Sequence, residues 1–192
     1  MTDTPVAKQP PLTLRFLGSL LRLMPKGRHL VCRRAVSLMS DKGPYRVRFD
    51  EGQSVMAVDL NDVLGRYVLV DGFWEPIVTS VFLHLLEPGQ TLIDVGAHSG
   101  YFTLLAARRI RPGGKIVAFE PDAKNRKHLA DNLALNGCGD IAVEPLAVSA
   151  SDGNVLFEPS NEQNSGAANV VEPQQAGVRS QMESIRAVSL DT

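Results

Sequence analysis

The twenty residues TLIDVGAHSGYFTLLAARRI, Thr91 to Ile110, constrain the fold of this chain more than any other stretch. An apolar run reaches an acid at Asp94, and a glycine-rich segment follows from Gly96 to Gly100. Apolar residues then recur at the spacing of an α-helix, which predicts a strand, a turn and a helix in succession. Such a junction gathers backbone N–H groups at the positive end of a helix dipole, and it therefore favours the polar end of a small ligand.

Strands and helices continue to alternate after this unit. The next predicted elements are a strand over 115–119, a helix over 123–135 and a strand over 141–148. Strands that alternate with helices form a parallel sheet with right-handed crossovers, so the predicted fold class is α/β. Further along, we expect a short strand at 155–157, a long polar loop over 161–175 and another strand within 178–190.

The segments before this core differ in pattern. Two basic, apolar stretches, 12–24 and 28–39, have helical spacing, and residues 45–60 alternate as a β-hairpin does. Residues 61–72 fit a short helix or a strand, and residues 77–86 fit a helix. The expected organisation is a basic helical extension over 1–43, a β-hairpin lead-in over 44–71 and a ligand-binding domain over 72–192.

The charge of the chain is unevenly distributed. Residues 1–49 hold ten Lys and Arg against two acids, a net charge of +8, whereas the remainder has a net charge of −9. Residues 12–39 therefore admit two interpretations: helices packed on the domain, or an amphipathic segment resting on an anionic membrane surface. The body of the chain has no basic stripe with interleaved aromatic residues, which argues against a nucleic-acid partner.

The cysteine and histidine residues indicate the cellular compartment and argue against a metal site. Two cysteines, Cys32 and Cys138, form neither a disulfide framework nor a CxxC motif, so we expect a cytoplasmic protein, with possible peripheral contact at the inner membrane face. The four histidines show no metal-ligand spacing, and no metal is expected.

Acidic residues end the first two predicted strands. Ligands of open α/β sheets bind beyond the carboxyl ends of the strands, where Asp94 and Glu120 stand. A carboxylate at the second position can accept both hydroxyl protons of a ribose. The glycine spacing is not GxGxxG, and no Gly-Lys-Ser/Thr follows, so a pyrophosphate-cradling loop fits poorly. An acid before the turn suits a ligand with an ammonium group, such as the amino-acid end of S-adenosylmethionine.

Three segments together, DVGAHSGYFTLLA, VAFEPDAKNRKHLADNLALNG and PLAVSASDG, resemble the S-adenosylmethionine-dependent methyltransferases of the FkbM type. The resemblance covers residues from about Gly72 to Asp191, including GFWEPIV. It implies a Rossmann-like class I methyltransferase fold and methyl transfer to a hydroxyl oxygen of a sugar, a glycan or a secondary metabolite. It implies S-adenosylmethionine as cofactor. The cofactor-binding residues that we predict are Asp94, Gly96, Ala97, His98, Gly100, Glu120 and Pro121.

His98 stands where asparagine is commoner in the family, and we interpret it as a turn residue rather than a catalytic base. No catalytic residue is assigned, and the oligomeric state is not indicated. The family continues beyond the segment AVSLDT with further strands, so we expect a parallel sheet that is incomplete at the C-terminus and has an exposed edge on the strand at 91–95. The predicted function is O-methylation; the alternative is a truncated, non-catalytic fragment or interaction module that binds S-adenosylmethionine.

Overall fold

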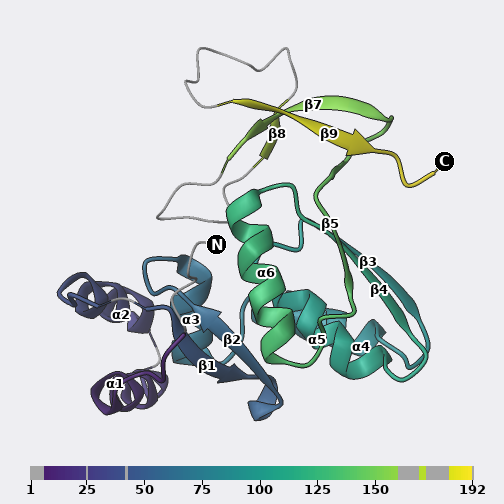
Figure 1. The fold of residues 1–192 in the computed structure, drawn as a ribbon. Helices are drawn as coiled ribbons and strands as arrows, with labels where there is room; N and C mark the ends of the chain where they lie inside the picture. The colour runs from purple at the N-terminus through teal and green to yellow at the C-terminus, as the bar shows by residue number, and fades with distance from the viewer. Residues whose placement is uncertain (1–6, 25, 42, 160–168, 172–181, 192) are drawn as a thin grey trace. The chain divides into compact units, whose positions relative to one another are not determined.

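The computed structural model describes residues 7–24, 26–41, 43–159, 169–171 and 182–191. The chain divides into two compact units, Met1–Phe82 and Leu83–Thr192 (Figure 1). Helix α4 (Pro76–Leu85) contains the boundary between them.

The first unit combines helices with a two-stranded sheet. Its elements are the helices α1 (Leu12–Arg22), α2 (Arg28–Ser37) and α3 (Val63–Asp71), the strands β1 (Tyr45–Phe49) and β2 (Ser54–Val58), and the single 3-10 turn η1 (Asp50–Gly52) between the strands. The hairpin is antiparallel, as predicted, and pairs Tyr45 with Val58. The segment for which helix and strand were both open, 61–72, forms the helix α3.

Helices α1 and α2 both pack on α3. On α1, Leu14, Gly18 and Leu21 are buried. A side chain at Gly18 would bring its Cβ to 3.3 Å from the carbonyl oxygen of Leu69, so glycine permits the close approach of α1 to α3. The inner face of α1 therefore belongs to the core of the first unit.

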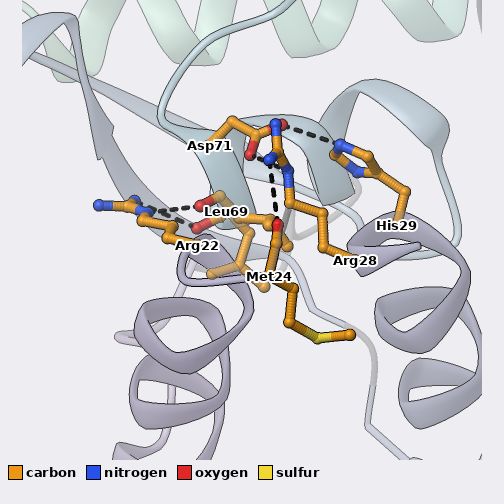
Figure 2. A network of polar contacts seen from close by, with 7 residues as sticks. Arg22, Met24, Arg28, His29, Leu69 and Asp71 are labelled. Atoms are coloured by element: carbon orange, nitrogen blue, oxygen red, sulfur yellow. Dashed lines mark hydrogen bonds and ion pairs between the residues drawn. The ribbon is translucent and has the colours of Figure 1, made fainter. Parts of the chain in front are cut away.

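An acid at the end of α3 joins α2 to this core (Figure 2). The carboxylate of Asp71 lies 2.8 Å from Nε of Arg28 and 2.9 Å from Nε2 of His29, and its side chain is only 5% exposed. The His29 ring also stacks on Tyr67 with a centroid distance of 3.7 Å. Loss of Asp71 would leave the Arg28 charge without its partner in a partly buried position.

Arg22 makes a second connection, from α1 to the last turn of α3 (Figure 2). Its Nε donates to the carbonyl oxygen of Val70, and its Nη2 donates to that of Leu69 at 3.5 Å. The last carbonyls of a helix lack partners within the helix and attract cations. Arg22 thus donates hydrogen bonds to carbonyl groups of α3 that would otherwise bond to water.

The second unit is the predicted α/β core. Its first elements are β3 (Thr91–Val95), α5 (Tyr101–Ile110), β4 (Lys115–Phe119), α6 (Ala123–Leu135) and β5 (Ala142–Glu144). The three strands are parallel in the order β3-β4-β5, so the predicted α/β class with a parallel sheet is confirmed. Among the described residues β3 pairs only with β4, and it therefore presents the exposed edge that we expected.

The predicted single strand over 141–148 is wrong. The segment forms β5 and then β6 (Ala147–Val148), which belong to different sheets. Pro145 lies between them and has no N–H to donate to a ladder, which explains why the pairing stops. The family-like segment PLAVSASDG therefore leads out of the parallel sheet.

A second sheet has the order β6-β9-β7-β8, with β7 at Gly153–Glu158, β8 at Asn169–Val171 and β9 at Glu183–Val188. The strands β7 and β9 agree with the strands predicted at 155–157 and within 178–190. The predicted loop over 161–175 needs correction because residues 169–171 form β8 and pair with β7. The rest of that segment lies outside the described residues.

None of the described helices alone is long and apolar enough to span a bilayer. The pair α3 and α4 meets the length and composition criteria together, but the two helices are bent by 77° at their junction.

Replacement of Asp71 by alanine tests the connection between α2 and α3. We expect Asp71→Ala to lower the free energy of unfolding of the first unit by about 2 kcal/mol, because it removes the contacts of this carboxylate with Arg28 and His29 and leaves the Arg28 charge uncompensated. The single tryptophan, Trp74, lies in this unit and reports its urea unfolding by fluorescence. Asp41→Ala, which removes an exposed ion pair with Lys8, is the control and should have a much smaller effect. Equal effects of the two substitutions would contradict this account.

Candidate functional site

The candidate site begins where β3 and β4 end. The strands are parallel and Val95 pairs with Phe119, so the segments that follow them emerge at the same edge of the sheet. The amides of Gly96 and Ala97 both donate to the carbonyl oxygen of Phe119, at 2.9 and 3.0 Å. The turn after β3 is thereby folded back onto the end of β4.

The carboxylate of Glu120 bonds the turn after β3 to the segment after β4. Its Oε2 accepts a hydrogen bond from the amide of His98 at 2.7 Å, and its Oε1 accepts one from the amide of Asp122 at 2.9 Å. Glu120 is only 4% exposed. Burial raises the pKa of this carboxyl, although both N–H donors oppose the shift. A carboxylate has about four lone-pair positions, so two bonds leave capacity for ligand hydroxyls.

Asp94 has a different partner. Its carboxylate accepts hydrogen bonds from the hydroxyl and the backbone N–H of Thr103, in the first turn of α5. Burial raises the pKa of Asp94, and the bonds from Thr103 oppose the shift. The structure thus shows Asp94 bonded to the first turn of α5; its contact with a ligand ammonium stays a prediction.

The two glycines of the turn serve different purposes. Gly96 has a φ of +76° and is exposed, and no atom lies within 4 Å of the position that a Cβ would occupy there. A ligand can therefore approach its backbone closely. Gly100 has a φ of +91°, and a Cβ there would lie 2.6 Å from Cδ1 of Leu129 on α6. Glycine is favoured at this position because its φ is positive and because a Cβ would displace the side chain of Leu129.

His98 lies in the left-handed region, with a φ of +55°. Asparagine, aspartate and histidine tolerate this region better than other residues with a side chain. The backbone conformation therefore explains why this position suits asparagine or histidine. Its Nδ1 lies 3.1 Å from the hydroxyl oxygen of Ser99. This geometry favours the interpretation of His98 as a turn residue.

Sequence reasoning missed two polar residues that hold the turn. Asn132 on α6 is fully buried and donates from Nδ2 to the carbonyl oxygen of Ser99 at 2.8 Å. Thr103 on α5 is also fully buried and donates to Asp94. The available signal was a polar side chain at the helical spacing of the buried residues Leu129 and Leu133 on α6 or Leu104 and Ile110 on α5, since a buried polar group requires a partner.

Arg126 was also missed. Its Nη1 donates to the carbonyl oxygens of Glu120 and Pro121, both at 2.9 Å. Pro121 thus contributes its carbonyl oxygen to the local structure. Asp122 begins α6 by accepting from the amides of Lys124 and Asn125, both at 2.9 Å, in the manner of an N-cap.

All seven residues of the predicted set lie in the two segments that meet at this edge. That each of them binds the cofactor stays a prediction. The chemistry of the site fits the expected ligand: an exposed glycine backbone that a ligand can approach, a buried carboxylate with spare lone pairs, and the N-terminus of α5.

Comparison with known families identifies the class of protein that this site defines. The family model of the methyltransferase FkbM domain matches residues 94–192. The chain belongs to this family of methyltransferases, whose cofactor is S-adenosylmethionine.

Similar proteins were found among curated sequences and solved structures. The chain is 33% identical over 94 residues to the AMB antimetabolite synthetase AmbE of Pseudomonas aeruginosa, covering 49% of this chain and 4% of that protein. It is 38% identical over 64 residues to a protein-L-isoaspartate O-methyltransferase of Aeropyrum pernix, covering 32% of this chain and 25% of that protein. The matched segments are thus small parts of these relatives.

Among solved structures, an S-adenosylmethionine-dependent O-methyltransferase of Thermotoga maritima is 15% identical. The match covers 63% of this chain and 59% of that chain, with a TM-score of 0.36.

Two substitutions of His98 separate a turn role from a chemical role. We expect His98→Asn to leave the unfolding temperature unchanged, because asparagine adopts a positive φ readily. Its affinity for S-adenosylmethionine should stay within about twofold of that of the unsubstituted chain. We expect His98→Val to lower stability by about 1–2 kcal/mol, because a β-branched residue is strained there. Thermal unfolding and calorimetric titration measure both effects. A loss of cofactor binding in His98→Asn with unchanged stability would show instead that the imidazole itself contacts the ligand.

Proposed function

We propose that this chain transfers the methyl group of S-adenosylmethionine to an oxygen atom of a small-molecule acceptor, a hydroxyl group of a sugar, a glycan or a secondary metabolite. Membership of the FkbM methyltransferase family supports the methyl-transfer chemistry. The Aeropyrum pernix relative is an O-methyltransferase by name, which supports an oxygen acceptor.

The observation that carries the proposal is the Glu120 carboxylate bound to the turn beside Gly96. In the proposed complex, the remaining lone pairs of Glu120 accept the ribose hydroxyl protons of the cofactor. The exposed backbone at Gly96 and the half-buried Asp94 receive the amino-acid end, where a carboxylate suits an ammonium group. In this proposal the ribose hydroxyls and the ammonium group of the cofactor each meet a carboxylate that accepts their hydrogen bonds.

The cofactor supplies an activated methyl group, and the residues of the chain supply its position. Methyl transfer requires the acceptor oxygen to approach the methyl carbon in line, so orientation provides much of the rate enhancement. The turn is well suited to hold a ligand rigidly, because β4, α5 and α6 all bond to it or to the acid before it. In this proposal the residues of the turn and the acid before it position the cofactor.

A cytoplasmic location is part of the same proposal. Cys32 and Cys138 are both unpaired and buried, as in proteins of reducing compartments.

Glu120→Gln tests the proposal, with Glu87→Gln as the matched control. Glu87 is exposed and precedes β3, so it lies at the opposite end of that strand from the site. We expect Glu120→Gln to weaken binding of S-adenosylmethionine about tenfold or more, which corresponds to about 1.4 kcal/mol. Glu87→Gln should bind as the unsubstituted chain does. Calorimetry measures the affinities.

Formation of S-adenosylhomocysteine with a panel of saccharides and hydroxylated metabolites measures the transfer itself. We expect at least one hydroxylated acceptor to raise the rate of S-adenosylhomocysteine formation above the rate measured without an acceptor. Tight cofactor binding without turnover on any acceptor would instead support the alternative of a non-catalytic module that binds S-adenosylmethionine.

A further inference from the structure

Helix α1 and its C-cap residue, Leu23, expose a line of large apolar side chains. Leu12 is 78% exposed, Phe16 72%, Leu20 51% and Leu23 80%. Successive members are four, four and three residues apart. At about 100° per residue, they fall within about 80° of the helix circumference. We refer to these four residues as the apolar stripe.

The apolar stripe cannot be buried by rotation of its own helix. Leu14, Gly18 and Leu21 occupy the opposite side of α1 and are buried, and α1 packs on α3. Arg22 is bonded to the carbonyl oxygens of Leu69 and Val70 at the end of α3. The inner face of α1 therefore packs in the core of the first unit. The apolar stripe consequently stays on the surface of that unit.

The surroundings of the apolar stripe are strongly basic. Five cationic residues of α1, α2 and the segment between them are exposed: Arg15, Arg22, Lys26, Arg33 and Arg34. The acid Asp41 is paired with Lys8. The surface that carries the apolar stripe thus belongs to the segment 1–49, whose net charge is +8.

Helix α2 repeats the same combination. Leu30, Val31 and Leu38 are exposed alongside Arg33 and Arg34. Both helices thus expose apolar and cationic side chains together. This combination fits a partner with an anionic surface layer over an apolar interior.

We propose that α1 docks on a bilayer of anionic lipids, with the apolar stripe entering the boundary between headgroups and acyl chains. Amphipathic helices bind in this way when large apolar residues lie on one face and Lys or Arg contact anionic headgroups. Charge disfavours a symmetric pair of chains joined through this face, because the two basic segments would repel each other. The two interpretations of residues 12–39 then apply to two faces of α1: the inner face packs on the protein, and the outer face meets the lipid.

Vesicle flotation of the full chain tests this proposal. Neutral vesicles of phosphatidylcholine are compared with vesicles that also contain phosphatidylglycerol. We expect flotation with the anionic vesicles only, and a decrease at high salt, because screening weakens the attraction of basic residues. The proposal does not rest on methyltransferase activity, so failure of one leaves the other standing.

Variants of the apolar stripe identify the docking face. Phe16→Ser combined with Leu20→Ser should lower vesicle binding about tenfold or more, because the apolar area that enters the membrane is lost. Ile77→Ser is the matched control, since Ile77 is 79% exposed on α4 and lies outside the apolar stripe. It should float as the unsubstituted chain does. Circular dichroism of each variant confirms that the helices remain folded.

A Phe16→Trp variant reports insertion directly. Its fluorescence emission should shift to shorter wavelength when anionic vesicles are added, because the indole leaves water. Three outcomes overturn the proposal: absence of flotation with anionic vesicles, equal flotation of the Phe16→Ser, Leu20→Ser variant, or a dimer in sedimentation velocity that the same variant dissociates. The last result would assign the apolar stripe to self-association.

Discussion

The buried carboxylate of Glu120 is the group on which the geometry of the site depends. It bonds to the amide of His98 in one segment and to the amide of Asp122 in the other. Each bond to a charged group contributes about 1.5–3 kcal/mol, while burial of a carboxylate costs several kcal/mol. The two terms are of similar size, so Glu120 contributes little net stability. A charge kept in such a position is better explained by what it binds.

The rest of the junction holds the turn in place around this carboxylate. The carbonyl oxygen of Phe119 accepts from two successive amides of the turn, and Asn132 reaches across from α6 to Ser99. Asp94 secures the first turn of α5 through Thr103. Because β4, α5 and α6 each supply a bond, a ligand at Gly96 meets a backbone that needs little ordering on binding.

Much of the second unit was predictable because its signals are local. Helical spacing and glycine positions located β3, α5, β4 and α6, and the position of Glu120 at a strand end indicated its place beside the turn. Pro145 was a visible signal for the end of β5, but the apolar residues on either side of it suggested continuity. The role of Asn132 depends on a contact with Ser99 across 33 residues of sequence. No local pattern specifies such a contact.

Amide chemical shifts report residue by residue whether the junction of β3 and β4 binds S-adenosylmethionine. The isotopically labelled chain is titrated with S-adenosylmethionine and followed by two-dimensional nitrogen–proton correlation spectra. We expect the largest shifts at the amides of Gly96, His98 and Asp122, with little change in β1 and β2. Unchanged amides at the junction at saturating cofactor, or the largest shifts in another part of the chain, would contradict binding at this junction.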